Sequence, residues 1–170
     1  VDSRTLSTAI SLEAIYAKKL TETMDDPAKI VELVKKRIPA VQASFIIERL
    51  DYLYKGGRCS GLALLGANLL KIRPEIEVLN GNMKNTEKFR GKRADCVTKY
   101  WRATLAKYNH PDKSVIFITH SVADKELVDA AKAVVSEYGF ENVYETTAGC
   151  TVSSHCGKNT LGILYINDAE

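Results

Sequence analysis

The sequence contains no run of apolar residues long enough to span a bilayer, so we expect no stable membrane anchor. It also has no visible export signal, because Val1-Asp2-Ser3 is neither basic nor followed by an uncharged apolar core. The net charge is only +3, and the basic run Lys35-Lys36-Arg37 is short, which argues against a nucleic-acid-binding protein. The chain does not begin with Met, which is compatible with a missing upstream segment.

Cysteines are few, and none of the four forms a C-x-x-C pair, which argues against a zinc site; we expect no metal. A disulfide between Cys150 and Cys156 is conceivable. Without an export signal, however, we expect free thiols and a cytoplasmic protein. His155 precedes Cys156 directly, but neighbours in a strand point to opposite faces, so we do not expect them to form a nucleophilic pair.

Sequence signatures of enzymes are also absent. There is no Walker A loop, no G-x-G-x-x-G and no G-x-S-x-G elbow. The three histidines, at positions 110, 120 and 155, are scattered. His120 follows a predicted buried strand, where α/β proteins place sites, but that position equally suits a hydrogen-bonded structural histidine. We therefore expect no catalytic residue and no cofactor.

The residues that are present describe an ordinary globular chain of 170 residues, 45% apolar and 26% charged. Apolar periodicity and turn residues predict an α/β fold, a mixed β-sheet with flanking helices. Asp26 and Pro27 suit the N-cap and first position of a helix that Pro39 ends, and Asn80-Gly81 predicts a hairpin whose return strand lies at a sheet edge. Ser121 with Asp124 resembles a capping box. The predicted helices cover residues 6–20, 27–38, 50–55, 61–71, 93–108 and 121–138, and the predicted strands cover 41–47, 76–79, 83–89, 115–119, 142–145 and 163–166.

Two segments carry candidate binding chemistry. In the first, Gly56-Gly57 precedes Arg58 and a helix start, so the backbone can approach a ligand beside a fixed positive charge. A tight turn with a surface arginine explains the same residues. The second, residues 149–162, is predicted to be a polar loop that presents hydroxyls, backbone N–H groups and the His155 imidazole to an anion. A surface loop with a solvated histidine is the alternative.

Together these segments resemble the DegV family. Residues 50–61 resemble its signature of a helix followed by Lys-Gly-Gly-Arg and a Ser. His155, Gly157 and Gly162 fit its terminal Gly-Thr-His-x-Gly-Pro-Gly-x-Leu-Gly loop. Further resemblances, in the expected order, lie at Asp2-Ser3-Arg4, Leu65-Gly66, Leu69-Leu70, Ile72-Arg73-Pro74, Asn80-Gly81 and residues 89–94.

The sequence departs from the family pattern in two ways. Lys158-Asn159 stands where the family has Pro-Gly, which suggests a looser or more electropositive loop and a changed ligand preference. The family also carries an N-terminal segment, most of its first domain, whose Thr and Ser hydroxyls hold a carboxylate. That segment is missing here, so we expect either a fragment or a partner chain.

The resemblance implies that residues 1–40 are the C-terminal tail of the flavodoxin-like first domain and that residues 41–170 form the second domain. It implies a bacterial carrier that binds a fatty acid and presents it to a fatty acid kinase for phospholipid synthesis. The carboxylate would be held by Arg58, Ser154 and His155, and the fatty acid would be the ligand in place of a cofactor. Candidate acyl-chain linings, each also explained as plain core, are Leu62, Leu65, Leu69, Phe117 and Leu164.

A carrier suits these residues because a carboxylate needs donors rather than a nucleophile. Burying roughly fourteen methylenes at about 0.8 kcal/mol each gives on the order of 11 kcal/mol before entropy costs. Arg90 and Arg93, predicted at the start of a helix whose apolar side faces inward, are expected to face a protein partner, although surface charge explains them equally well. Two other functions remain open: a hydrolase or transferase using His155, and an interaction module without ligand.

Overall fold

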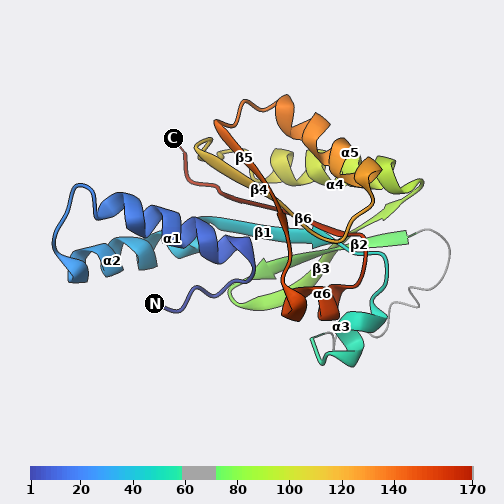
Figure 1. The fold of residues 1–170 in the computed structure, drawn as a ribbon, viewed down its shortest axis with the longest axis horizontal. Coiled ribbons are helices and arrows are strands. Elements are labelled where there is room, and N and C mark those ends of the chain that lie inside the picture. Colours follow the sequence, from blue (N-terminus) through green and yellow to red (C-terminus); the bar gives the residue numbers. More distant parts are fainter. Residues whose placement is uncertain (59–71, 170) are drawn as a thin grey trace.

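The computed structural model describes residues 1–58 and 72–169, which form one mixed six-stranded sheet with helices on both faces (Figure 1). The strand order is β3-β2-β1-β6-β4-β5. The helices are α1 (Thr8–Leu20), α2 (Pro27–Arg37), the 3₁₀ turn η1 (Ile38–Ala40), α3 (Asp51–Lys55), α4 (Arg93–Lys107), α5 (Lys125–Ser136) and α6 (Cys150–Cys156). The strands are β1 (Val41–Ile46), β2 (Ile72–Leu79), β3 (Asn82–Arg90), β4 (Val115–Ser121), β5 (Asn142–Thr147) and β6 (Thr160–Ile166). The predicted α/β class with a mixed sheet is confirmed.

The pairing of the strands follows their turn chemistry. β2 and β3 form the predicted hairpin, with Asn80 at φ 52° and Gly81 at φ 79°, the left-handed pair that suits a tight hairpin turn. β1 lies antiparallel to both β2 and β6, while β4 pairs with β5 in parallel and with β6 antiparallel. β3 lies at the sheet edge, as its polar sequence predicts.

The helices α4 and α5 cover one face of the sheet (Figure 1). Trp101 and Tyr100 of α4 are fully buried there with Ile116 and Ile163 of the sheet. The predicted inward side of this helix is confirmed, since Val97, Trp101 and Leu105 are buried. Alternation along β4 and β6 sends the neighbouring side chains to the opposite face, which therefore needs a cover of its own.

The helix α1 covers part of that second face. Ala9 and Leu12 pack in one buried cluster with Ala43 and Leu164 of the sheet. The helix α2 begins as predicted, because the Asp26 side chain accepts hydrogen bonds from two backbone N–H groups of its first turn. The assignment of residues 1–40 to a first domain stays a prediction.

Of two further predictions about helices, one is wrong and the other is not tested. The capping box is wrong: α5 starts at Lys125 with Asp124 as its N-cap, and Ser121 belongs to β4. The predicted helix over residues 61–71 lies outside the described residues. Within the described ranges, no helix is long and apolar enough to cross a membrane.

Two buried carboxylates lie beneath α4. Glu75 and Glu77 of β2 point to the α4 face, where Thr104 Oγ1 donates to Glu75 Oε1 at 3.3 Å and Lys107 Nζ contacts Glu77 Oε1 at 2.6 Å. Burial raises the pKa of Glu75 to about 7, and the charge of Glu77 adds to this shift. The hydrophobic layer under α4 therefore contains a carboxyl, that of Glu75, whose neutral form is the one compatible with its burial.

We predict that the pH dependence of stability contains a contribution from Glu75. Its pKa is raised on folding, so its stabilising contribution is complete below the unfolded value near 4.5 and is lost as pH rises through about 7. Between pH 5 and 8 the free energy of unfolding should fall more steeply in the wild type than in Glu75→Gln, by up to about 3 kcal/mol. Denaturant unfolding across this range measures the difference. Glu126→Gln, on the exposed side of α5, is the control, and equal slopes for wild type and Glu75→Gln would contradict the prediction.

Candidate functional site

A cavity of about 210 Å³ opens on the second face of the sheet, between the start of α1 on one side and α3 with α6 on the other. Its floor is apolar, with Ala43, Phe45 and Leu164 from the two central strands β1 and β6. Gly162 continues this floor, and a Cβ added there would lie 2.9 Å from the Ser44 carbonyl oxygen. No carboxylate is among the described residues that line the cavity, so its wall suits an apolar group or an anion.

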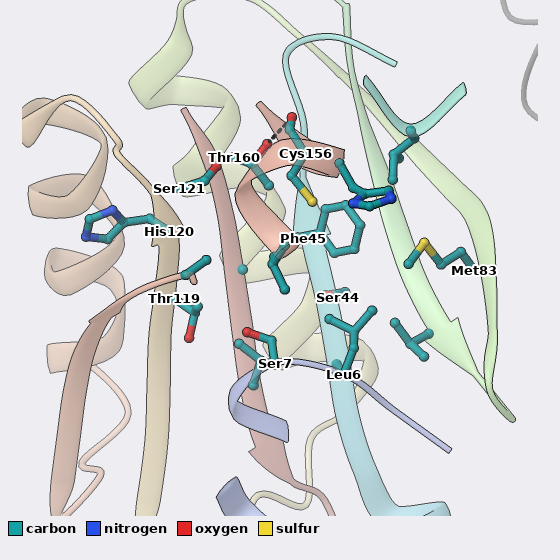
Figure 2. A pocket seen from close by; sticks show the side chains of 18 of the residues that line it. Leu6, Ser7, Ser44, Phe45, Met83, Thr119, His120, Ser121, Cys156 and Thr160 are labelled. Atoms are coloured by element: carbon teal, nitrogen blue, oxygen red, sulfur yellow. Dashed lines mark hydrogen bonds between the residues drawn. The ribbon is translucent and has the colours of Figure 1, made fainter. Parts of the chain in front are cut away.

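Figure 2 shows how separate elements contribute to the wall. Leu6 and Ser7 come from the segment that starts α1, and Met83 reaches in from β3. The sulfur of Cys156 points toward the ring of Phe45. The cavity is therefore assembled from segments spread over most of the chain.

The segment with the predicted polar loop is a helix. Cys150–Cys156 forms α6, so the loop prediction for these residues is wrong, and so is the placing of His155 and Cys156 in a strand. Ser and Thr have low helix propensity, but here their hydroxyls satisfy the backbone: Ser153 Oγ donates to the Ala148 carbonyl at 3.0 Å and Ser154 Oγ to the Thr151 carbonyl at 3.0 Å. The helix α6 is also stabilised by packing against α3 and β4.

His155 is held by its own helix. Its Nδ1 lies 2.7 Å from the Thr151 carbonyl oxygen, one turn earlier. A carbonyl only accepts, so Nδ1 carries the hydrogen and Nε2 is the nitrogen that remains for a ligand. His155 also lines the cavity, which makes Nε2 the ring nitrogen that α6 offers to it.

The turn after α3 lies directly against this ring. A Cβ added at Gly56 would lie 2.2 Å from His155 Cδ2 and 2.8 Å from Nε2. Gly56 has φ −75° and ψ −3°, which any residue can adopt, so the glycine is needed for the close approach and not for the backbone. The next residue, Gly57, has φ 71°, which favours glycine for conformational reasons. The paired glycines thus have two different physical causes.

Arg58 follows this turn and lines the cavity. Its Nη1 donates to the Gly56 carbonyl oxygen at 2.6 Å, which leaves its other N–H groups for a ligand. Gly56 therefore contacts both polar groups, Arg58 through its carbonyl and His155 through its Cα. A second close contact joins α3 to the end of α6, since a Cβ at Gly157 would lie 2.7 Å from the ring of Tyr52.

The structure brings some predicted site residues together and separates others. Arg58, His155 and Leu164 line the cavity. Ser154 is exposed and does not line it, and Phe117 packs near Tyr144, with ring centroids 5.5 Å apart, beneath α1. Leu62, Leu65 and Leu69 lie outside the described residues. Binding by any of these side chains stays a prediction.

Most of the apolar wall consists of residues that the sequence did not identify as cavity lining, including Leu6, Phe45, Met83 and Cys156. Alternation along residues 41–47 was the available signal for Phe45, which shares a face with Ala43. Burial raises the pKa of the Cys156 thiol to about 11, so it is a neutral, apolar part of the wall. The described cysteines, Cys96, Cys150 and Cys156, are unpaired.

His120 also lines the cavity, but both of its ring nitrogens already have partners within the chain. Its Nδ1 accepts from the Ala123 backbone N–H at 3.2 Å, and its Nε2 lies 3.2 Å from Glu145 Oε1. Figure 2 shows its ring turned away from Phe45 and Cys156. In the described parts of the chain, no cluster of three or more His, Cys, Asp or Glu side chains is arranged to hold a metal ion.

The two arginines near α4 have different surroundings. Arg90 is exposed at the end of β3, not at the start of the helix as predicted. Arg93 is the first residue of α4 and is half-exposed; it contacts Glu48 through Nε at 2.7 Å and Asp124 through Nη1 at 3.0 Å. A role of either in binding a partner stays a prediction.

The contact between Gly56 and His155 yields a testable prediction. Gly56→Ala should displace the imidazole or the α3 turn, because the added methyl overlaps the ring, and should destabilise the fold by roughly 1–3 kcal/mol. Denaturant unfolding measures the loss. The same substitution made in a His155→Ala background is the control: with the ring gone, alanine should cost almost nothing. An equal cost in both backgrounds would contradict the contact.

Comparison with known proteins agrees with this architecture. The chain matches the model of the family described as "Uncharacterised protein, DegV family" over residues 1–168. A fatty acid-binding protein of Thermotoga maritima is 29% identical over 171 residues, which cover 95% of this chain and 57% of that protein. A solved structure on fatty acid binding by a DegV family protein from Thermus thermophilus superposes with a TM-score of 0.85 at 20% identity, covering 99% of this chain and 60% of that one.

The Streptococcus pneumoniae fatty acid kinase B3 protein, solved loaded with linoleic acid, gives a TM-score of 0.84 at 18% identity, covering 99% of this chain and 59% of that one. The chain thus spans less than two thirds of the length of each of these proteins. The family match covers nearly all of its residues, and the fold agrees with the solved members. The chain belongs to the DegV family.

Proposed function

We propose that this chain is the larger part of a carrier that binds a long-chain fatty acid and presents it to a separate fatty acid kinase for phospholipid synthesis. The observation that carries the proposal is an apolar cavity whose described lining includes the nitrogen-bearing side chains of Arg58, His120 and His155 and no carboxylate. A molecule with an apolar chain and an anionic head fits both features. The fatty acid is then the ligand, and no cofactor is required.

The carboxylate is assigned to Arg58 and His155. The guanidinium offers a fixed charge and donors beyond the one used on the Gly56 carbonyl. The Nδ1 hydrogen of His155 is occupied by the Thr151 carbonyl, so Nε2 donates to a carboxylate when the ring is an imidazolium. Ser154, which is exposed and bonded to the Thr151 carbonyl, would have to reorient to take part.

The acyl chain is assigned to the apolar floor between β1 and β6. About 210 Å³ is less than the roughly 300–1,000 Å³ of typical small-molecule pockets, so a long chain would extend beyond these walls or widen them. Leu164 and Phe45 lie on the floor, and Met83, a flexible side chain, can adapt to different chains. The names of the Thermotoga, Thermus and Streptococcus relatives support a fatty acid as ligand.

The geometry disfavours the hydrolase alternative. Ser154 Oγ lies 3.3 Å from His155 Nδ1, but that nitrogen carries its hydrogen toward the Thr151 carbonyl and has no lone pair for the serine. Ser154 Oγ donates to the same carbonyl. A nucleophile needs a base that can accept its proton, and this arrangement offers none to Ser154. The binding role therefore has the stronger structural support.

Replacing His155 tests the proposed carboxylate site. We predict that His155→Ala weakens fatty-acid binding by roughly 10- to 100-fold, the loss of one charge-assisted hydrogen bond. Isothermal titration with oleate on the full-length protein measures it, and mass spectrometry of lipid extracted from the purified protein identifies the native ligand. His110→Ala is the matched control, because this histidine is exposed and outside the cavity. A folded His155→Ala variant with wild-type affinity would contradict the assignment of the carboxylate to His155.

The kinase half of the proposal rests on exposed Arg90 and half-exposed Arg93. A guanidinium can bind both oxygens of a carboxylate, which makes exposed arginines good anchors for a protein partner. We predict that Arg90→Ala with Arg93→Ala keeps its fatty acid but supports slower phosphorylation by the kinase. Ligand occupancy and kinase rate are measured on one preparation, with Arg102→Ala, an exposed α4 arginine paired to Glu137, as the control. A normal kinase rate would leave both arginines as surface charge.

A further inference from the structure

The turn that joins α6 to β6 is tied by side chains to the connection between β4 and α5. We infer that Asp124, Lys158 and Asn159 form a polar clasp that positions His155 for its ligand. The inference rests on the proposed function for what the ligand is, while the clasp itself rests on contacts within this chain. These three residues are positioning residues, since none of them lines the cavity.

Asn159 is the centre of the clasp. It is buried, with 6% of its surface exposed, and has φ 63°, the left-handed conformation that Asn tolerates better than most residues. Its Oδ1 accepts from the Asp124 backbone N–H at 2.8 Å, and its Nδ2 donates to Asp124 Oδ2 at 3.1 Å. Its own backbone N–H donates to the Ser121 carbonyl at 3.1 Å. A buried side chain with both ends paired fixes the turn in one conformation.

Lys158 closes the clasp from outside. Its Nζ lies 2.8 Å from Asp124 Oδ1, while Arg93 Nη1 lies 3.0 Å from Asp124 Oδ2. The contacts of Lys158 and Asn159 hold the pKa of Asp124 below its usual range. The positive charge at position 158 is therefore directed at Asp124, and the loose loop that Lys158-Asn159 suggested in the sequence is replaced by a turn with specific partners.

The clasp connects to His155 through the end of α6. Ser121 Oγ donates to the Gly157 carbonyl, and Thr160 Oγ1 donates to the Cys156 carbonyl at 2.9 Å. The two carbonyls that follow His155 are thus both bonded to strand residues that flank the clasp. An isolated helix of this length is not stable in water, so α6 takes its position from such anchors.

The position matters because the ring of His155 has little freedom on its other side. Its Cδ2 lies against Gly56, and Gly157 lies against the ring of Tyr52. A small shift of the α6 end would move Nε2 relative to Arg58, and the two would no longer converge on one carboxylate. This chain has Lys158-Asn159 where the family pattern has Pro-Gly, and polar contacts of these two residues hold the turn.

The test removes the clasp and then restores the turn without it. Asp124→Ala should weaken oleate binding roughly five- to tenfold and shift the ring signals of His155 in a ¹H–¹³C spectrum, where only three histidines appear. The side chain of Asp124 makes no capping hydrogen bond to α5, so the helix keeps its start. Asp129→Ala, which removes an exposed α5 carboxylate paired to Lys125, is the control and should change neither readout.

Adding Lys158→Pro and Asn159→Gly to Asp124→Ala should recover the affinity and the His155 signals, because proline and glycine fix the turn without a side-chain partner. The extended ψ of Gly157, 174°, suits a residue before proline. If Asp124→Ala does not fold, Asp124→Asn, which keeps the shape and loses the charge, is judged by the same criteria.

An Asp124 variant that matches Asp129→Ala in affinity and in the His155 signals would overturn the clasp, and so would a loss that the turn substitutions do not recover. A wild-type protein that binds no oleate would count against the proposed function instead. In that case the His155 signals still decide the inference, since they report the ring position without ligand.

Discussion

The site depends on the contact between Gly56 and His155, two residues from segments far apart in the chain. The ring approaches the glycine so closely that a single methyl group would overlap it. This approach brings the turn of α3, with Arg58, to the end of α6, with His155. The packing of Tyr52 against Gly157 secures the same interface. Without this interface, the Arg58 guanidinium after α3 and the His155 imidazole on α6 would have no fixed position relative to each other.

The sheet explains why this interface has a cavity beside it. α4 and α5 fill one face with large side chains such as Trp101 and Tyr100. On the other face, α1 covers one part through Ala9 and Leu12, and α3 with α6 cover another. Between them, small or flat residues such as Ala43 and Gly162 leave the floor uncovered. The apolar space is thus a consequence of where the covering helices end.

Much of the fold could be predicted from the sequence, because strong local signals mark its elements. Asp26-Pro27 and Asn80-Gly81 act through their own backbone and neighbours, and the structure confirms both. The failures lie where tertiary contacts decide. Ser121 resembles an N-cap, yet its hydroxyl binds the Gly157 carbonyl. Residues 150–156 resemble a loop, yet they form a helix whose serine hydroxyls bond backbone carbonyls and which packs against α3 and β4.

The candidate site shows the same division. Arg58 and His155 were identifiable because each stands in a glycine-rich motif, and both line the cavity. Ser154 stood in the same motif, but a helix turns it outward, which a loop prediction could not anticipate. The apolar wall was not identifiable, because Leu6, Phe45 and Met83 have no local feature that separates a cavity lining from a core.

A crystal structure of the full-length protein with a bound fatty acid is the strongest test of the proposed binding site. We expect a carboxylate within about 2.7–3.2 Å of both His155 Nε2 and an Arg58 nitrogen, with the acyl chain running over the floor formed by Phe45 and Leu164. A carboxylate that contacts neither side chain, or an acyl chain on the α4 side of the sheet, would contradict it.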